Sequence, residues 1–295
     1  MISNKPIISS PDNQWIKLCK NLIEGGKERK IFFIAEGSKL IKSLLTEYKP
    51  EVLLTSEAFL EGLDLYPPAP LTVGDEKGNQ YDESFNLALQ IVSDRLWPKL
   101  TEMNSPVKLI GIFRKPEISD NSLNHSTGDF LVLDRIQDPG NMGTIIRTAV
   151  ASGWENLICL KGCVDPFSPK VVRSSAGALC GLKIFTGILH EDLSNILMDK
   201  DFLVVHSSSH ASLDLKDNTS PSLSSLEQKK QKSTCLILGN EGQGVDEAFI
   251  QKLSCQIKSE NLIDLKLPMV NIDKVESLNV AIAGALLMYK LKGMI

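Results

Sequence analysis

The sequence predicts an α/β protein of two domains, the second of them built on a mostly parallel sheet. Its 295 residues are long enough for two domains with separate hydrophobic cores. Short apolar runs alternate with helical patterns along most of the chain, and a polar stretch at 116–128 divides them into two groups. Strands that are apolar on both faces and separated by helices are typical of parallel sheets.

The first domain is expected over residues 1–115. Its first helix is predicted at 12–24, because apolar residues recur at i, i+3, i+4, i+7 and i+8. Asp12 is the expected N-cap of this helix and Gly25-Gly26 its end. Further strands are predicted at 31–35, 52–54 and 107–113, and further helices at 38–48 and 82–96.

The second domain is expected over residues 129–295, after a linker at 116–128. Its predicted strands are more hydrophobic than those of the first domain and cover 130–133, 157–160, 202–205, 235–238 and 263–267. Helices are predicted between most of these strands, and the polar stretch 217–232 is expected on the surface.

Composition favours an ordinary soluble protein of the cytoplasm, with 42% hydrophobic and 23% charged residues. The first residues lack the apolar core of a secretion signal. The longest apolar run, 281–289, is far shorter than the ~20 residues of a membrane-spanning helix. The six cysteines are scattered without a Cys-x-x-Cys pair, so reduced thiols are expected and no metal site.

The net charge of −4 argues against a protein that coats nucleic acid through bulk charge. Basic residues nevertheless gather near the start of the chain. They are Lys17, Lys20, Lys27, Arg29, Lys30, Lys39 and Lys42. This cluster is either a solvated face or a local surface for RNA.

A polar turn follows the predicted strand at 130–133 and leads into a helix at 144–152, with Asn141 as the expected N-cap. Ligands of parallel sheets bind at the carboxyl ends of strands, so this turn is a candidate site. Arg147 falls on the flank of the helix beside Gly143 and Ala151, where small residues leave room for a ligand. The alternative is a solvated arginine.

Two further segments carry weaker signals. The glycine-rich loop 239–244 follows the strand at 235–238 and is either a ligand cradle or a tight turn with an incidental glutamate. A helix is predicted to start at Ser168-Pro169. Lys170 and Arg173 lie one turn apart on it and either bind phosphate or form a solvated edge.

The last helix is apolar on every side, which predicts burial by its own domain or by a partner. Residues 273–276 fit a capping box at its start. Ser277 and Asn279 are expected in the first turns of this buried helix, where buried polar groups need hydrogen-bonding partners.

Together these segments resemble the three sequence motifs of the SpoU (TrmH-type) RNA ribose 2′-O-methyltransferases, in the SPOUT superfamily. The first motif corresponds to 141–149, the second to 238–244, and the third to 267–269 with 276–280. The first ~115 residues resemble the family's L30e-like substrate-binding domain less strongly.

The resemblance implies an α/β domain closed by a deep trefoil knot, a homodimer, and S-adenosyl-L-methionine (AdoMet) bound in the knot without a metal. It implies that Gly239, Leu267 and Met269 hold AdoMet through backbone groups and that Leu278 packs against it. It also implies that Arg147 is a base or an activator of the hydroxyl. Because arginine is essentially never neutral in proteins, we expect Arg147 to stabilise the developing alkoxide and to orient phosphate. The residues that would hold Arg147 and the ribose are Asn141, Glu241, Ser277 and Asn279. The expected RNA-binding residues are Lys17, Lys27, Arg29, Lys30, Lys170 and Arg173.

The expected function is therefore AdoMet-dependent methylation of a ribose 2′-hydroxyl in RNA. The added N-terminal domain favours rRNA over tRNA. One departure from the family pattern is the segment 270–274, which is longer than usual and has no glycine. The alternatives are a catalytically weak, knotted RNA-binding protein and a nucleotide-dependent α/β enzyme such as a dehydrogenase.

Overall fold

The computed structural model describes residues 5–60, 88–101, 108–116, 122–200, 202–207, 213–214, 232–240, 242–269 and 277–295. The chain forms two compact units. The first consists of Met1–Glu117 with Phe167–Cys180, and the second of Ile118–Pro166 with Gly181–Ile295. The segment Phe167–Cys180, which the sequence suggested would belong with the second half, therefore groups with the first.

The first unit has a mixed five-stranded sheet. Its strands in spatial order are β1 (Ile7–Ile8), β4 (Leu89–Val92), β3 (Pro50–Thr55), β5 (Leu109–Arg114) and β2 (Phe32–Glu36). β4 runs parallel to both of its neighbours, whereas β5 runs antiparallel to β3 and β2. Its helices are α1 (Gln14–Glu24), η1 (Lys27–Lys30), α2 (Ser38–Leu44), α3 (Glu57–Leu60), η2 (Asp94–Lys99) and α7 (Pro169–Ser174).

Helix α1 packs its predicted apolar stripe into the core of the first unit, where Ile16, Cys19 and Leu22 are buried with the strand residues. The N-cap is Asn13, whose side chain accepts from the Trp15 N–H, so the prediction of Asp12 was wrong by one position. The helix ends at Gly25 as predicted.

The prediction of a helix at 82–96 was wrong where the structure describes this segment. Strand β4 lies between β1 and β3, and its Leu89, Ile91 and Val92 are buried. The 3-10 helix η2 follows it and includes Pro98. Pairing on both sides, together with burial, outweighs the local helical pattern.

Helix α7 packs against β2 within the first unit. The ring centroid of Phe167 lies 5.3 Å from that of Phe33. The helix starts after Ser168 with Pro169 in its first turn, as predicted. The guanidinium of Arg173 lies 3.7 Å from the carboxylate of Glu36.

The second unit has a seven-stranded sheet in which all pairings are parallel. Its strands in spatial order are β10 (Leu213–Asp214), β12 (Leu262–Lys266), β9 (Leu203–Ser207), β11 (Thr234–Leu238), β6 (Phe130–Leu133), β7 (Asn156–Leu160) and β8 (Lys183–Ile188). The mostly parallel sheet that the sequence predicted is confirmed, with β8 and β10 as additions.

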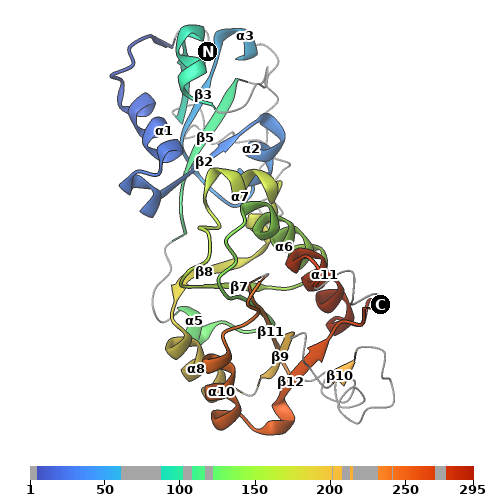
Figure 1. Cartoon of the computed structure of the whole chain (residues 1–295). Coiled ribbons are helices and arrows are strands. Elements are labelled where there is room, and N and C mark those ends of the chain that lie inside the picture. Colours follow the sequence, from blue (N-terminus) through green and yellow to red (C-terminus); the bar gives the residue numbers. More distant parts are fainter. Residues whose placement is uncertain are drawn as a thin grey trace, which may run out of the picture. The chain divides into compact units, whose positions relative to one another are not determined.

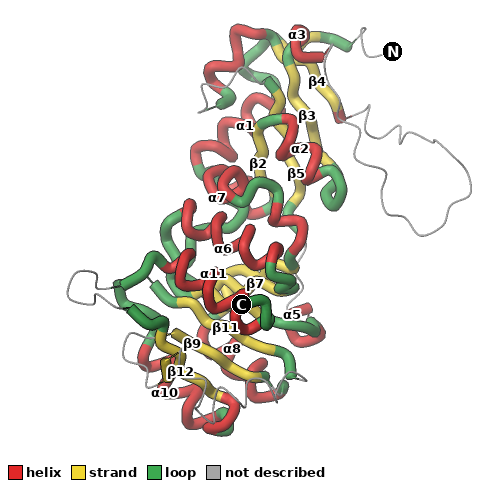
Figure 2. Tube along the Cα trace, turned by 90° about the vertical axis from the view of Figure 1, so that its right-hand side faces the viewer, coloured by secondary structure: helices red, strands yellow, loops and turns green. Residues whose placement is uncertain are grey.

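Helices cover both faces of this sheet (Figure 1). Helices α8 (His190–Asp199) and α10 (Glu247–Gln256) lie side by side and share one core with alternate strand residues such as Val132 and Ile237. Helices α6 (Pro139–Ala151) and α11 (Val280–Leu291) also lie side by side, as Figure 2 shows from a second direction.

Helix α11 approaches β11 closely because Gly284 has no side chain. A Cβ at this position would lie 2.6 Å from Leu238 Cδ1, which is less than real Cβ contacts allow. A short helix, α5 (Ser122–His125), lies in the segment predicted as a linker. In the described part of the chain, no helix combines the length and the apolarity that a bilayer crossing requires.

The predicted trefoil knot requires that the C-terminal segment is threaded through a loop of the second unit. In this unit, residues 208–212, 215–231 and 270–276 lie outside the described residues. They include most of the predicted surface stretch 217–232 and all of 270–274. The knot therefore stays a prediction.

Candidate functional site

Helix α6 carries the first motif. Its N-cap is Asp138, whose carboxylate accepts the Asn141 N–H at 2.7 Å, so Asn141 lies in the first turn and is not the cap that the sequence suggested. The predicted apolar stripe is buried at Met142, Ile145, Ile146 and Ala149. Arg147 is exposed, and the structure records no hydrogen bond or ion pair for it with any described residue.

Helix α11 begins later than the sequence suggested. Asn279 is its N-cap, and the Asn279 Oδ1 accepts from the N–H groups of Ala281 at 2.9 Å and Ile282 at 3.4 Å. A capping box at 273–276 is therefore not the start of this helix. Ser277 and Asn279 are exposed rather than buried, because they precede the helix.

One hydrogen bond links the first motif to the third. The Asn279 Nδ2 donates to the Asn141 Oδ1 at 3.0 Å, across the packed pair α6 and α11. Both asparagines stand at the beginnings of their helices, and Arg147 projects from α6 two turns further on. The structure thus brings two predicted site residues into contact and leaves the guanidinium accessible.

The second motif forms a tight loop after β11. The backbone groups of Asn240 and Gly244 exchange hydrogen bonds of 3.0 and 2.8 Å. Gly239 lies so close to this turn that a Cβ would be 2.1 Å from the Gly244 carbonyl carbon. Only glycine fits at this position. Glu241 lies outside the described residues.

Three apolar side chains of the predicted cofactor site are incompletely buried. Leu267 and Met269 follow the carboxyl end of β12, and Leu278 precedes α11. Apolar groups that remain partly exposed suit a flat, largely apolar ligand group. The assignment of these residues and Gly239 to the nucleoside part of AdoMet stays a prediction.

The sequence did not reveal a group of charged residues that contacts the glycine-rich loop 239–244. Asp134 and Arg135 follow β6 directly, and Asp134 is completely buried. His190 Nε2 lies 3.2 Å from Asp134 Oδ1. The available signal was the position of Asp134-Arg135 at the carboxyl end of a strand, which the turn interpretation passed over.

The predicted RNA-binding residues have different environments. Lys17, Lys27, Lys30 and Lys170 are exposed. Lys17 pairs with Asp12 at 3.0 Å. Arg29 donates to the carbonyls of Leu22 and Ile23 at 2.6 and 2.7 Å, so its guanidinium caps the end of α1.

Burial changes the pKa values of two side chains in the second unit, Cys163 and His206. Burial raises the pKa of the Cys163 thiol to about 11, although backbone hydrogen bonds oppose the shift. Burial also lowers the pKa of His206 despite Asp264 at 3.4 Å. Within the described residues, no group of His, Cys, Asp and Glu could hold a metal ion.

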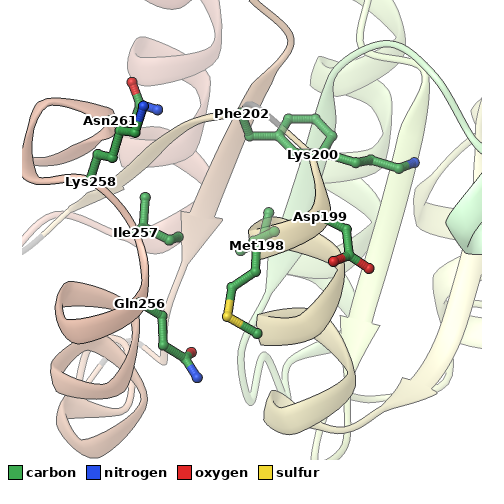
Figure 3. A pocket seen from close by; sticks show the side chains of 9 residues that line it. Met198, Asp199, Lys200, Phe202, Gln256, Ile257, Lys258 and Asn261 are labelled. Atoms are coloured by element: carbon green, nitrogen blue, oxygen red, sulfur yellow. The ribbon is translucent and has the colours of Figure 1, made fainter.

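A cavity of about 330 Å³ lies near the amino ends of β9 and β12, opposite the carboxyl ends that carry the motifs. Figure 3 shows the side chains that line it. Phe202, Ile257 and Asn261 are among its lining residues. Lys200 points away from it and donates to the Ser126 carbonyl at 2.6 Å. This cavity contains none of the motif residues.

Comparison with known proteins gives one consistent picture. A model of the SpoU rRNA Methylase family matches residues 129–289. The 23S rRNA (guanosine(2553)-2′-O)-methyltransferase RlmP of Bacillus subtilis is 27% identical over 97% of this chain and 99% of its own length. A solved structure assigned to the TrmH family, from Porphyromonas gingivalis, is 26% identical with a TM-score of 0.69, covering 97% of this chain and 98% of that one.

A second solved structure, an AdoMet-bound rRNA methyltransferase from Sinorhizobium meliloti, superposes with a TM-score of 0.73 over 98% of both chains. At 22% identity this similarity concerns the fold alone.

Proposed function

The chain belongs to the SpoU rRNA methylase family, and from this premise we propose that it methylates a ribose 2′-hydroxyl of rRNA with AdoMet as the methyl donor. The observation that carries the proposal is the hydrogen bond from Asn279 to Asn141, which lies on the same helix as the exposed Arg147. It joins the first and third motifs. The alternative of a nucleotide-dependent dehydrogenase has no support from the family.

AdoMet would be held by Gly239, Leu267 and Met269, with Leu278 packed against it. When bound, it would supply the methyl group of its sulfonium to the ribose 2′-oxygen, and S-adenosylhomocysteine would leave as the C–S bond breaks. Arginine is not deprotonated in proteins, so Arg147 does not act as a base. Its guanidinium stabilises the negative charge that develops on the 2′-oxygen and holds a neighbouring phosphate.

The 2′-hydroxyl proton is released to water or to an RNA phosphate oxygen. Asn141, Glu241, Ser277 and Asn279 orient Arg147 and the ribose. The hydrogen bond from Asn279 fixes the Asn141 amide at the start of α6. Holding these groups in place before the reaction avoids the cost of ordering them during it.

Ribosomal RNA is favoured over tRNA because RlmP, similar over 97% of this chain, acts on 23S rRNA. The first unit is the proposed RNA-binding domain, of the L30e-like type. Its exposed Lys17, Lys27, Lys30 and Lys170 would bind phosphates without reading the base sequence. The cytoplasm, where rRNA is processed in bacteria, is the proposed location.

A homodimer completes the proposal. Helix α11 exposes 53% of Ile282 and 40% of Leu286, although it is apolar on every side. These residues lie one turn apart and therefore on the same face. A second copy of the chain would cover this face.

The test is methyl transfer from labelled AdoMet to rRNA from cells that lack this gene. The wild type should label the RNA. Arg147→Ala should be about 100-fold slower, since removal of one group that stabilises an oxyanion has this order of effect. Lys252→Ala, which removes an exposed cation on α10, is the matched control. If AdoMet binds but no RNA pool is labelled, the catalytically weak RNA-binding alternative is correct.

A further inference from the structure

The carboxylate of Asp134 is completely buried at the carboxyl end of β6. Its Oδ2 accepts the backbone N–H of Asp246 at 2.9 Å and a guanidinium N–H of Arg135 at 3.2 Å. Its Oδ1 lies 3.2 Å from His190 Nε2, whose ring packs on Phe249 with a centroid separation of 4.5 Å. A buried carboxylate is costly unless such partners compensate for lost hydration.

Arg135 contacts the loop after β11 at three points. Its NH1 donates to the Gln243 Oε1 at 3.1 Å, and its NH2 donates to the Gly244 carbonyl at 3.3 Å. Its own carbonyl accepts from the Asn240 Nδ2 at 3.0 Å. Asp134 adds a fourth point through the Asp246 N–H. Two adjacent residues thus hold both ends of the loop.

Arg135 has a backbone φ of +57°, in the left-handed region that residues other than glycine rarely adopt. This conformation is strained, because it brings the Cβ too close to the following carbonyl oxygen. It directs the carbonyl and the guanidinium of one residue toward the same loop. Strain of this kind persists where the surroundings hold it and is concentrated at functional sites.

We propose that Asp134 and Arg135 are positioning residues that hold the loop around Asn240, Gln243 and Gly244 in its AdoMet-binding conformation. This inference rests on the proposed function, because the family resemblance is what assigns the loop to the cofactor. Arg135 acts on the loop, and Asp134 acts through Arg135 and the Asp246 N–H. We assign neither residue a contact with the reacting atoms.

The test measures AdoMet affinity by calorimetry. The thermal stability of the ligand-free protein shows whether each variant folds. Arg135→Met removes the guanidinium and keeps the length of the side chain. It should raise the Kd of AdoMet about tenfold, because hydrogen bonds to charged groups are stronger than those between neutral groups. The KM for RNA should stay within about twofold of the wild type. Lys252→Met is the matched control and should bind AdoMet as the wild type does.

Gln243→Met keeps the proposal testable if Arg135→Met does not fold. It removes one acceptor of Arg135 and leaves the buried Asp134 intact, so the Kd should rise about threefold, as expected for one hydrogen bond. Arg135→Lys retains a cation but not the fork, and should fall between the wild type and Arg135→Met.

Three outcomes overturn the inference. AdoMet affinity of Arg135→Met and Gln243→Met within twofold of the wild type would do so while leaving the proposed function intact. A rise in the KM for RNA with unchanged AdoMet affinity would make Arg135 an RNA contact. A wild-type protein that does not bind AdoMet would overturn both the inference and the proposed function.

Discussion

The amide of Asn279 makes hydrogen bonds in two directions. Its oxygen accepts the N–H groups of Ala281 and Ile282 and so caps α11, while its nitrogen donates to Asn141 on α6. The first pair of bonds stabilises the helix, and the third orients a predicted site residue. Because different atoms serve the two roles, substitutions can separate them.

Asn279→Asp retains the cap and loses the donor. The free energy of unfolding should stay within about 0.5 kcal/mol of the wild type, because Asp and Asn cap helices about equally well. Methyl transfer should fall about tenfold, the effect of one net hydrogen bond of about 1.4 kcal/mol. Asn279→Ala loses both roles and should also lose about 1 kcal/mol of stability. Urea unfolding and the transfer assay measure the two effects, and full activity of Asn279→Asp would show that donation by the side chain at 279 is not needed.

Helix α11 has apolar residues on three sides, and two of these sides are packed within the chain. Gly284 lies against Leu238 of β11, a second side packs on α6, and Ile282 and Leu286 remain exposed. The sequence predicted burial on every side by the domain or a partner. Within one chain, the structure accounts for two of these sides.

Ile282→Glu combined with Leu286→Glu should convert a dimer into a monomer. Two charges at an apolar interface would each have to be buried without a partner. Sedimentation velocity should give two chains of 32.5 kDa for the wild type and one for the variant. Gln251→Glu, an exposed substitution on α10, should leave the mass unchanged. A monomeric wild type, or a variant that remains dimeric, would contradict the proposed interface.

The elements of the second sheet were predictable where strands are apolar on both faces. β6 matches its predicted bounds, 130–133, and four other strands differ from theirs by one or two residues. β8 was missed because its residues alternate between buried and exposed only in part, and Gly187 interrupts the run. β4 was mistaken for a helix, because its identity depends on pairing with β1 and β3.

The candidate site was predictable as a set of motifs but not as a set of contacts. Arg147 and Asn141 were identified from position and resemblance, and their detailed roles stay predictions. The Asp134–Arg135 group was missed, because its partners Gln243 and Asp246 are more than a hundred positions away. Only the fold brings these polar groups together.

At the scale of the whole molecule, the two units are interleaved along the chain. The chain passes between them after Glu117, after Pro166 and after Cys180. Phe167–Cys180 packs in the first unit through the ring contact of Phe167 with Phe33 and the ion pair of Arg173 with Glu36. The sequence of this segment resembles an ordinary connection between a strand and a helix, so its partner unit could not be predicted.

The most direct test of the proposed activity is a map of ribose 2′-O-methylation in total RNA from cells with and without this gene. Loss of methylation is predicted at one or more ribose positions of rRNA. Expression of the wild type should restore the methylation, and expression of Arg147→Ala should not. An unchanged map across rRNA and tRNA, in cells where the protein is made and AdoMet is present, would contradict the proposal.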